Sequence, residues 1–170
     1  MINMIKLKNI LLCILTLLSS CSHSVLSLPY VDADLQFAYN DWKYECKNYN
    51  IRIRQNVCKI DSIVFGELEE GYWGQCFGNK IVINESAMAP TDTFLVKLVL
   101  YHELGHCAFG YDHFDYGADI MNSVLPEDNI IAYKWFWEIL KEEYFSRYQL
   151  PKTRKKLNRG NSCGQVCIQS

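Results

Sequence analysis

The sequence of 170 residues lacks an excess of charge of one sign, a long apolar run and any visible internal repeat. Its 17 Lys and Arg stand against 19 Asp and Glu, for a formal net charge of −2, which gives no reason to expect nucleic acid as a partner. The apolar run from Ile10 to Leu18 is too short to span a bilayer comfortably. The length suits one domain with its own hydrophobic core.

The N-terminal residues predict export from the cytoplasm. Lys6 and Lys8 precede the apolar run, which is the pattern of a signal peptide over residues 1–20. The segment Leu18-Ser-Ser-Cys21 resembles a bacterial lipobox, and this resemblance implies cleavage before Cys21 and lipid attachment to that residue. Ser22, in place of an aspartate, implies sorting to the outer membrane. The alternative is an ordinary signal peptide that is cut nearby, with Cys21 incidental.

The cysteines indicate disulfide bonds in the exported chain. Without residues 1–20, the chain keeps 150 residues and a net charge of −4, because Lys6 and Lys8 are removed with the signal peptide. An even number of cysteines remains beyond Cys21, which favours disulfides in an oxidising compartment. The sequence does not choose among the pairings, and buried free thiols are the alternative. The six are Cys46, Cys58, Cys76, Cys107, Cys163 and Cys167.

Apolar spacing predicts an α+β domain over residues 32–150, after a linker over residues 21–31. Strands are expected at four short runs of apolar and β-branched residues, namely 51–54, 60–65, 72–77 and 80–84. Three helices are expected: residues 33–48, a second one that opens at Pro90–Asp92 and stops at Gly110, and residues 128–147.

Two features of the C-terminal part complete the predicted organisation. The run Trp135-Phe136-Trp137 in the last helix is expected to pack in the core. Residues 151–170 carry several Lys and Arg with little apolar content and predict a basic flexible tail, with a local Cys163–Cys167 pair as one way to hold it.

The sequence has only four histidines, and three of them fall within twelve residues, at His102, His106 and His113. His102 and His106 lie four residues apart, on one face of the second expected helix, where both can bind one metal ion. Glu103 follows the first histidine, where its carboxylate can activate a water molecule. This is the H-E-x-x-H arrangement of zinc hydrolases. The motif also occurs by chance, in which case both histidines are ordinary core or surface residues.

A catalytic zinc site needs a third protein ligand. The chain turns at Gly110 and supplies His113 three residues later. With H-E-x-x-H, this segment resembles the metzincin family of zinc endopeptidases, whose pattern is H-E-x-x-H-x-x-G-x-x-H. Met121, in the run Ala118-Asp-Ile-Met-Asn-Ser123, matches the methionine that the family places in a tight turn beneath the zinc. The resemblance covers residues 31–148 and implies a small α+β zincin domain with a short mixed sheet packed on the active-site helix.

The chain departs from the family pattern at one point. Three residues, Cys107 to Phe109, separate His106 from Gly110, where the family has two. Counting from the first histidine places Asp112 at the third-ligand position, whereas counting from Gly110 places His113 there. We favour His113, because one extra residue can be absorbed at a helix end. Asp112 remains the alternative ligand, or a support for the site.

Cys107 is expected to point away from the metal-binding face of the helix, although it follows His106 directly. A buried thiol or a disulfide is the favoured interpretation, with Cys76 as one candidate partner.

The resemblance implies Zn²⁺ as cofactor, bound by His102, His106 and His113, with Glu103 as catalytic base and Met121 as the floor of the site. The function expected is a zinc-dependent endopeptidase of the bacterial cell envelope, lipid-anchored at Cys21, acting on protein or peptide substrates. An extended substrate would add to the strand at residues 80–84 or to the strand at 72–77, and the sequence does not choose between them.

Two other functions stay open at this point. One is a zinc-stabilised binding module without catalysis, against which Glu103 argues, because a pure metal-binding module needs no general base. The other is a zinc hydrolase of a non-peptide envelope bond, although no segment resembles a wall-binding module.

Overall fold

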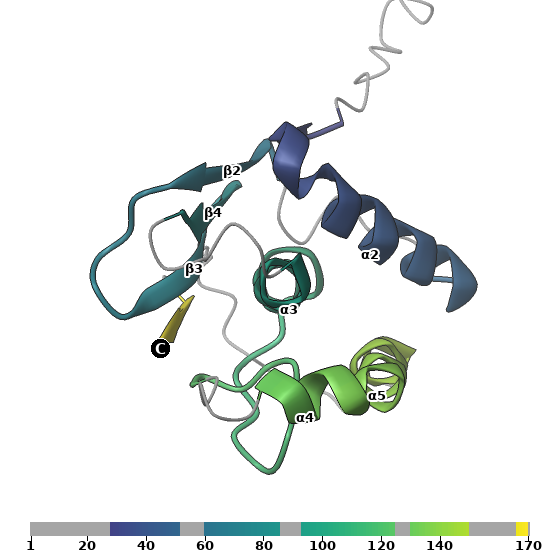
Figure 1. Cartoon of the computed structure of the whole chain (residues 1–170). Helices are drawn as coiled ribbons and strands as arrows, with labels where there is room; N and C mark the ends of the chain where they lie inside the picture. The colour runs from purple at the N-terminus through teal and green to yellow at the C-terminus, as the bar shows by residue number, and fades with distance from the viewer. Residues whose placement is uncertain (1–27, 52–59, 86–92, 125–129, 150–165, 170) are drawn as a thin grey trace, which may run out of the picture.

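A computed structural model describes residues 28–51, 60–85, 93–124, 130–149 and 166–169. Within these residues the fold is mixed, with a small sheet on one side and helices on the other, which agrees with the α+β expectation (Figure 1). Cys21 and the predicted signal peptide lie outside the described residues. None of the helices in the described part of the chain combines the length and the apolar character that crossing a membrane requires.

The sheet has five strands in the order β1-β2-β4-β3-β5. Strands β1 (Tyr30–Val31), β2 (Ser62–Gly66) and β4 (Lys80–Asn84) are parallel, whereas β3 (Tyr72–Phe77) runs antiparallel to β4. Strands β3 and β4 form a tight hairpin, and Gly78 in its turn has a φ of 53°, which favours glycine. The strands predicted at 72–77 and 80–84 are confirmed, and the one at 60–65 is shifted by two residues at its start. Of the strand predicted at 51–54, only Ile51 is described, and it lies outside any strand.

The fifth strand corrects the expectation of a flexible tail. Val166–Gln169 forms β5, which pairs antiparallel with β3 and forms the second edge of the sheet. The preceding residues 150–165 lie outside the described part of the chain. Four residues are too few to predict a strand by their pattern, because a strand this short depends on a partner edge that the local sequence does not specify.

The first predicted helix is confirmed. It starts with a 3₁₀ turn, η1 (Ala33–Leu35), and continues as α2 (Gln36–Asn48). Its predicted apolar positions are all buried, as expected for one face of an amphipathic helix. They are Leu35, Ala38, Tyr39, Trp42 and Cys46.

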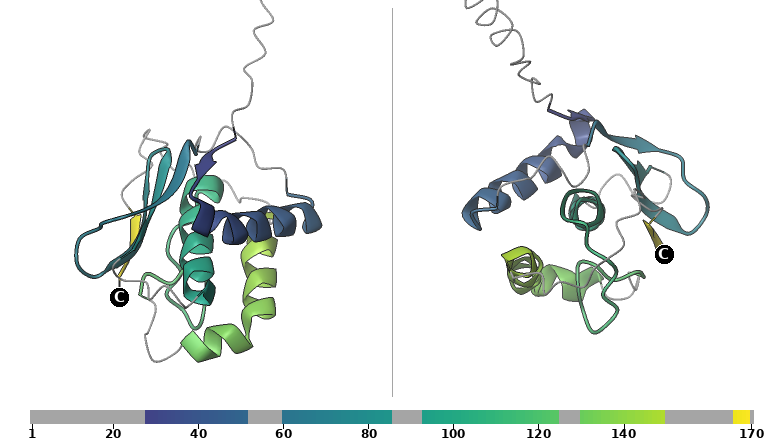
Figure 2. Two further views of the ribbon diagram at one scale, coloured as in Figure 1. Left: turned by 45° about the horizontal axis from the view of Figure 1, so that its top comes forward. Right: turned by 180° about the vertical axis from the view of Figure 1, so that it is seen from behind.

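The central helix of the fold is α3 (Thr93–Leu104), which continues into a π-helical turn, η2 (Gly105–Phe109). In both figures it lies between the sheet and the pair of helices α2 and α5 (Trp137–Gln149) (Figure 1 and Figure 2). Every residue from Leu98 to Phe109 is buried. The structure surrounds this part of the helix, because packing against a sheet and two helices leaves no free face.

The last predicted helix is interrupted at Phe136, which separates α4 (Ile130–Trp135) from α5. The expectation that the three aromatic residues here form core is wrong for two of them. Trp137 is buried, whereas Trp135 is 82% exposed and Phe136 is 53% exposed. The side chain of Trp137 instead packs edge-on against Tyr101 of α3, with ring centroids 5.1 Å apart.

Tyr144 joins the helices that surround α3. Its hydroxyl donates to the carbonyl oxygen of Tyr101 at 2.7 Å and lies 3.4 Å from the indole nitrogen of Trp42, which donates to it. Tyr144 is buried, so this satisfied network fixes α2 and α5 relative to the helix that carries the first histidine.

Candidate metal centre

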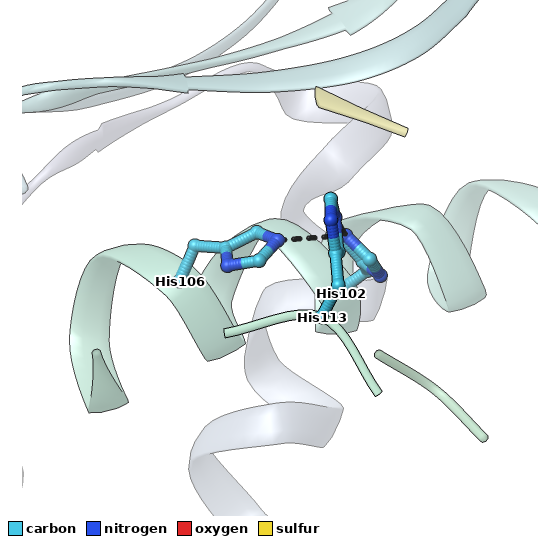
Figure 3. Close-up of side chains that lie close together, drawn as sticks. All are labelled: His102, His106 and His113. Atoms are coloured by element: carbon cyan, nitrogen blue, oxygen red, sulfur yellow. Dashed lines mark hydrogen bonds between the residues drawn. The ribbon is translucent and has the colours of Figure 1, made fainter. Parts of the chain in front are cut away.

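Three histidines converge on one point of the fold. His102 comes from the end of α3, His106 from η2, and His113 from the chain that follows (Figure 3). The Nε2 atom of His102 lies 2.8 Å from Nε2 of His106 and 3.2 Å from Nε2 of His113. Candidate ligand atoms from all three lie within 4.8 Å of one another, and no other such group of at least three metal-binding side chains occurs among the described residues.

The rings are held by hydrogen bonds from their other nitrogen atoms. Nδ1 of His102 lies 2.7 Å from the carbonyl oxygen of Ile120, and Nδ1 of His106 lies 2.6 Å from that of Tyr111. A carbonyl oxygen only accepts, so in both rings Nδ1 carries the proton and Nε2 carries a lone pair. These lone pairs face each other without a proton between them.

A bound cation fits this arrangement. Nitrogen ligands at ordinary zinc distances in a tetrahedral site lie about 3.3 Å apart, close to the separations found here. The carbonyl partners of Nδ1 are also the kind of outer contacts that orient metal-bound histidines. His102, His106 and His113 therefore lie close enough, and point correctly, to bind one metal ion.

The surroundings keep these histidines neutral, which is the form that binds metal. Burial, and next the neighbouring His106, hold the pKa of His102 well below its usual value. Burial lowers the pKa of His106 to about 4, and burial likewise lowers the pKa of His113. The site thus presents unprotonated rings at neutral pH.

The segment between His106 and Gly110 has one residue more than the metzincin pattern, and the π-helical turn η2 accommodates it. A π-turn contains one more residue than an α-turn and so absorbs an insertion without breaking the helix. Gly110 then ends the helix in the left-handed region, at φ 67° and ψ 38°, as predicted. The chain leaves this turn with His113 in the cluster, whereas Asp112 is exposed and lies outside it. The geometry favours His113 over Asp112 as the third candidate metal ligand.

Met121 lies in a turn against the same helix. It is fully buried, and Gly105 faces it so closely that a Cβ atom on Gly105 would collide with the Met121 sulfur. A glycine between the two helical histidines is therefore required by this methionine. The preceding residue, Ile120, supplies the carbonyl that orients His102, and Phe114 N–H donates to the Met121 carbonyl at 2.9 Å. The turn links the first and third histidines.

The turn is supported by an ion pair between the buried Asp119 and the partly buried Arg147, which the sequence did not reveal. Asp119 accepts a hydrogen bond from the backbone N–H of Met121 at 2.7 Å, and its carboxylate pairs with Arg147 of α5. The Arg147 guanidinium also lies over the ring of Phe114, 4.9 Å from its centre. Asp119 stands two residues before Met121, but 28 residues separate it from Arg147, and no local pattern connects them.

Glu103 is fully buried and belongs to the same helical turn as His102. It lies against Gly74 of β3, where a Cβ atom would come within 2.9 Å of the Glu103 carboxylate and 2.6 Å of Val99. Only glycine at this position lets the strand approach the helix so closely. The sequence singled out Glu103 but missed Gly74, because a single glycine in a predicted strand has no specific interpretation.

A disulfide joins Cys76 of β3 to Cys107 of η2, the pairing that was one candidate from the sequence. It ties the strand that covers Glu103 to the helical turn that carries His106. Cys46 is a buried free thiol, and burial raises its pKa to about 12. Cys107 accordingly belongs to the scaffold and lies outside the histidine cluster.

Neither of the two candidate substrate strands has a free edge. Strand β4 lies between β2 and β3 and pairs with both. Strand β3 pairs with β4 on one side and with β5 on the other. An extended peptide could therefore add to β3 only in place of β5.

The chain matches no model of a known protein family, no curated protein and no solved structure. The resemblance of residues 101–123 to metzincins therefore stays a prediction.

Proposed function

We propose that this protein is a zinc-dependent endopeptidase that hydrolyses peptide bonds in the bacterial cell envelope. The observation that carries the proposal is the convergence of three histidine rings beside a buried glutamate, with two of the rings oriented by backbone carbonyls. His102, His106 and His113 would hold the metal. Zinc bound there would act as a Lewis acid towards a peptide carbonyl and would lower the pKa of a water molecule towards about 7.

The chain's own residues supply the rest of the chemistry. Glu103 takes the proton from the attacking water and delivers it to the leaving amine, so it acts first as a base and then as an acid. Its burial between α3 and β3 keeps the carboxylate in one place, and Gly74 provides the space for it. Met121, packed closely against Gly105, forms the floor beneath the histidines.

The envelope location rests on the N-terminal sequence. The signal peptide pattern and the lipobox-like Leu18-Ser-Ser-Cys21 support export and lipid attachment at Cys21, and Ser22 supports the outer membrane. The Cys76–Cys107 disulfide fits an oxidising compartment. The substrates proposed are envelope proteins or peptides in extended conformation, which would bind to the backbone of β3 in place of β5.

The test compares three proteins produced from residue 22 onward: the wild type, Glu103→Gln and Glu67→Gln. Glu67 is an exposed glutamate that serves as a matched control. All three should bind one zinc ion, measured by elemental analysis. The wild type and the control should cleave unfolded protein and lose this activity with a chelator, whereas Glu103→Gln should lose at least about a hundredfold in kcat/KM.

Zinc-loaded wild type that leaves a broad peptide library intact would sink the peptidase proposal and favour the non-catalytic binding module. Hydrolysis of envelope amides that lie outside peptides would favour the non-peptide hydrolase instead.

A further inference from the structure

Strand β5 occupies the strand edge that a peptide substrate would need. It lies antiparallel to β3, with Val166 opposite Cys76, Cys167 opposite Gln75 and Ile168 opposite Gly74. Antiparallel addition of an extended segment to a sheet edge is the common way in which proteins bind peptides through main-chain hydrogen bonds. The chain thus places a segment of its own in the position of a bound peptide.

The register brings this segment close to Glu103. Ile168 is paired with Gly74, so its Cα lies about 5 Å from the glycine whose missing side chain makes room for the Glu103 carboxylate. Strand β5 also packs beside α3, the helix that carries His102. Figure 3 shows the end of β5, in yellow, between the sheet and the three histidines. Its backbone therefore lies beside the proposed reaction centre.

A peptide that adds to β3 must displace β5, because β4 already holds the opposite edge of β3. Most of the affinity in strand addition comes from backbone hydrogen bonds, which are the same for the two competitors. The internal segment has the advantage of covalent attachment, which gives it an effective concentration on the order of millimolar. Only abundant or well-fitting peptides would replace it.

We propose that β5 is an intramolecular competitor that occupies the peptide-binding edge of β3 and limits access of substrate to the histidine site. Competition between β5 and a peptide for the edge of β3 does not depend on catalytic activity. Its consequence for cleavage rests on the proposed peptidase function, so the two are tested by separate measurements.

The experiment weakens β5 in the full mature chain. In Ile168→Pro/Gln169→Pro, two adjacent backbone N–H groups are removed, and since they point to opposite sides of the strand, one of them faces β3. The matched control is Ile168→Thr/Gln169→Thr, which keeps both N–H groups and places a β-branched residue, favourable in strands, at each position. A third variant, Ile168→Gly/Gln169→Gly, weakens the strand while keeping its hydrogen-bond donors.

The probe is a fluorescein-labelled hexapeptide, Gln-Val-Ser-Ile-Gln-Ser, which copies residues 165–170 with serine in place of Cys167. Its fluorescence anisotropy should report binding at least about tenfold tighter to the proline variant than to the wild type, with the glycine variant between them. The threonine control should bind like the wild type. Cleavage of unfolded protein should follow the same order in kcat/KM.

Equal peptide binding by all four proteins would overturn the proposal, as would equal kcat/KM in active proteins. Tighter binding in the proline and glycine variants, with no cleavage by any protein, would support the competitor and refute the peptidase. Thermal unfolding and zinc content identify a misfolded proline variant, and the glycine variant then decides the outcome against the threonine control.

Discussion

The two sides of the candidate site are held in different ways. On the helical side, His102, His106 and the Met121 turn are fixed by short hydrogen bonds to particular backbone and side-chain oxygen atoms. On the sheet side, β5 is held on β3 by backbone pairing, which any extended segment can reproduce. The first side holds three histidines close enough to bind one metal ion, whereas the second rests on strand pairing.

The largest effect is expected at the third histidine. His113→Ala should lower zinc affinity by more than about a hundredfold and abolish cleavage, because it removes one of three converging nitrogen atoms. Asp112→Ala, the matched control next to it, should keep both zinc and activity. Zinc titration with a competing chelator measures the difference. Retained zinc in His113→Ala with loss in Asp112→Ala would reverse our choice of ligand.

The disulfide joins the two sides, so its loss should affect both. The double variant Cys76→Ala/Cys107→Ala should lose about 3–4 kcal/mol of unfolding free energy, since the bond closes a loop with a sequence separation of 31 residues. Cys46→Ala is the control, because Cys46 is buried but forms no disulfide. Urea unfolding of the zinc-loaded proteins gives the values. A loss of unfolding free energy no larger than that of Cys46→Ala would show that the disulfide contributes little to stability.

The metal-free helical side should weaken in acid. The pKa of His106 is about 4 in the folded chain because of burial, against an ordinary value of about 6.5. The unfolded chain therefore takes up protons first as the pH falls below about 6.5, and stability is lost from there down to about pH 4. Each histidine contributes up to about 1.4 kcal/mol per pH unit in this window.

This pH dependence is checked by urea unfolding of chelator-treated protein at pH 7, 6 and 5, with His106→Gln as the comparison. The variant should show a shallower loss of stability than the wild type. Identical slopes in the two proteins would contradict the assignment to His106.

The smallest effect concerns the contact between the two sides. Gly74→Ala should cost about 1–3 kcal/mol and reduce kcat, because the new methyl group meets Val99 and the Glu103 carboxylate. Zinc content should not change, since Gly74 supplies none of the ligand atoms of the cluster. Gly66→Ala is the control in β2, where the new atom meets only a Val82 methyl group at 3.0 Å. Equal kcat in both variants would remove Gly74 from the support of Glu103.

The metal site was largely predictable because its signals are local. The spacing of His102 and His106 places them on one helical face, and Gly110 marks the end of that helix in sequence as in structure. The contacts that support the site were not predictable. Asp119 meets Arg147, and Gly74 meets Glu103, across distances in sequence that carry no periodicity.

Local composition also misjudged exposure in two places. Trp135 and Phe136 looked like core by residue type, yet both are exposed at the point where α4 ends and before α5 begins. The C-terminal segment looked unstructured, yet four of its residues form β5. In each case the structure depends on which distant segment lies beside these residues, and residue type alone does not specify that segment.

The sequence by itself determined the chemistry available: three histidines and a glutamate at helical and turn spacing, and the cysteines that can form bonds. The tertiary structure decided how that chemistry is arranged. It brought His113 rather than Asp112 into the cluster through a π-helical turn, paired Cys76 with Cys107, and placed β5 on the edge of β3. The physical reason is that helix spacing is set by bonds between residues four apart, whereas these choices depend on packing between segments distant in the chain.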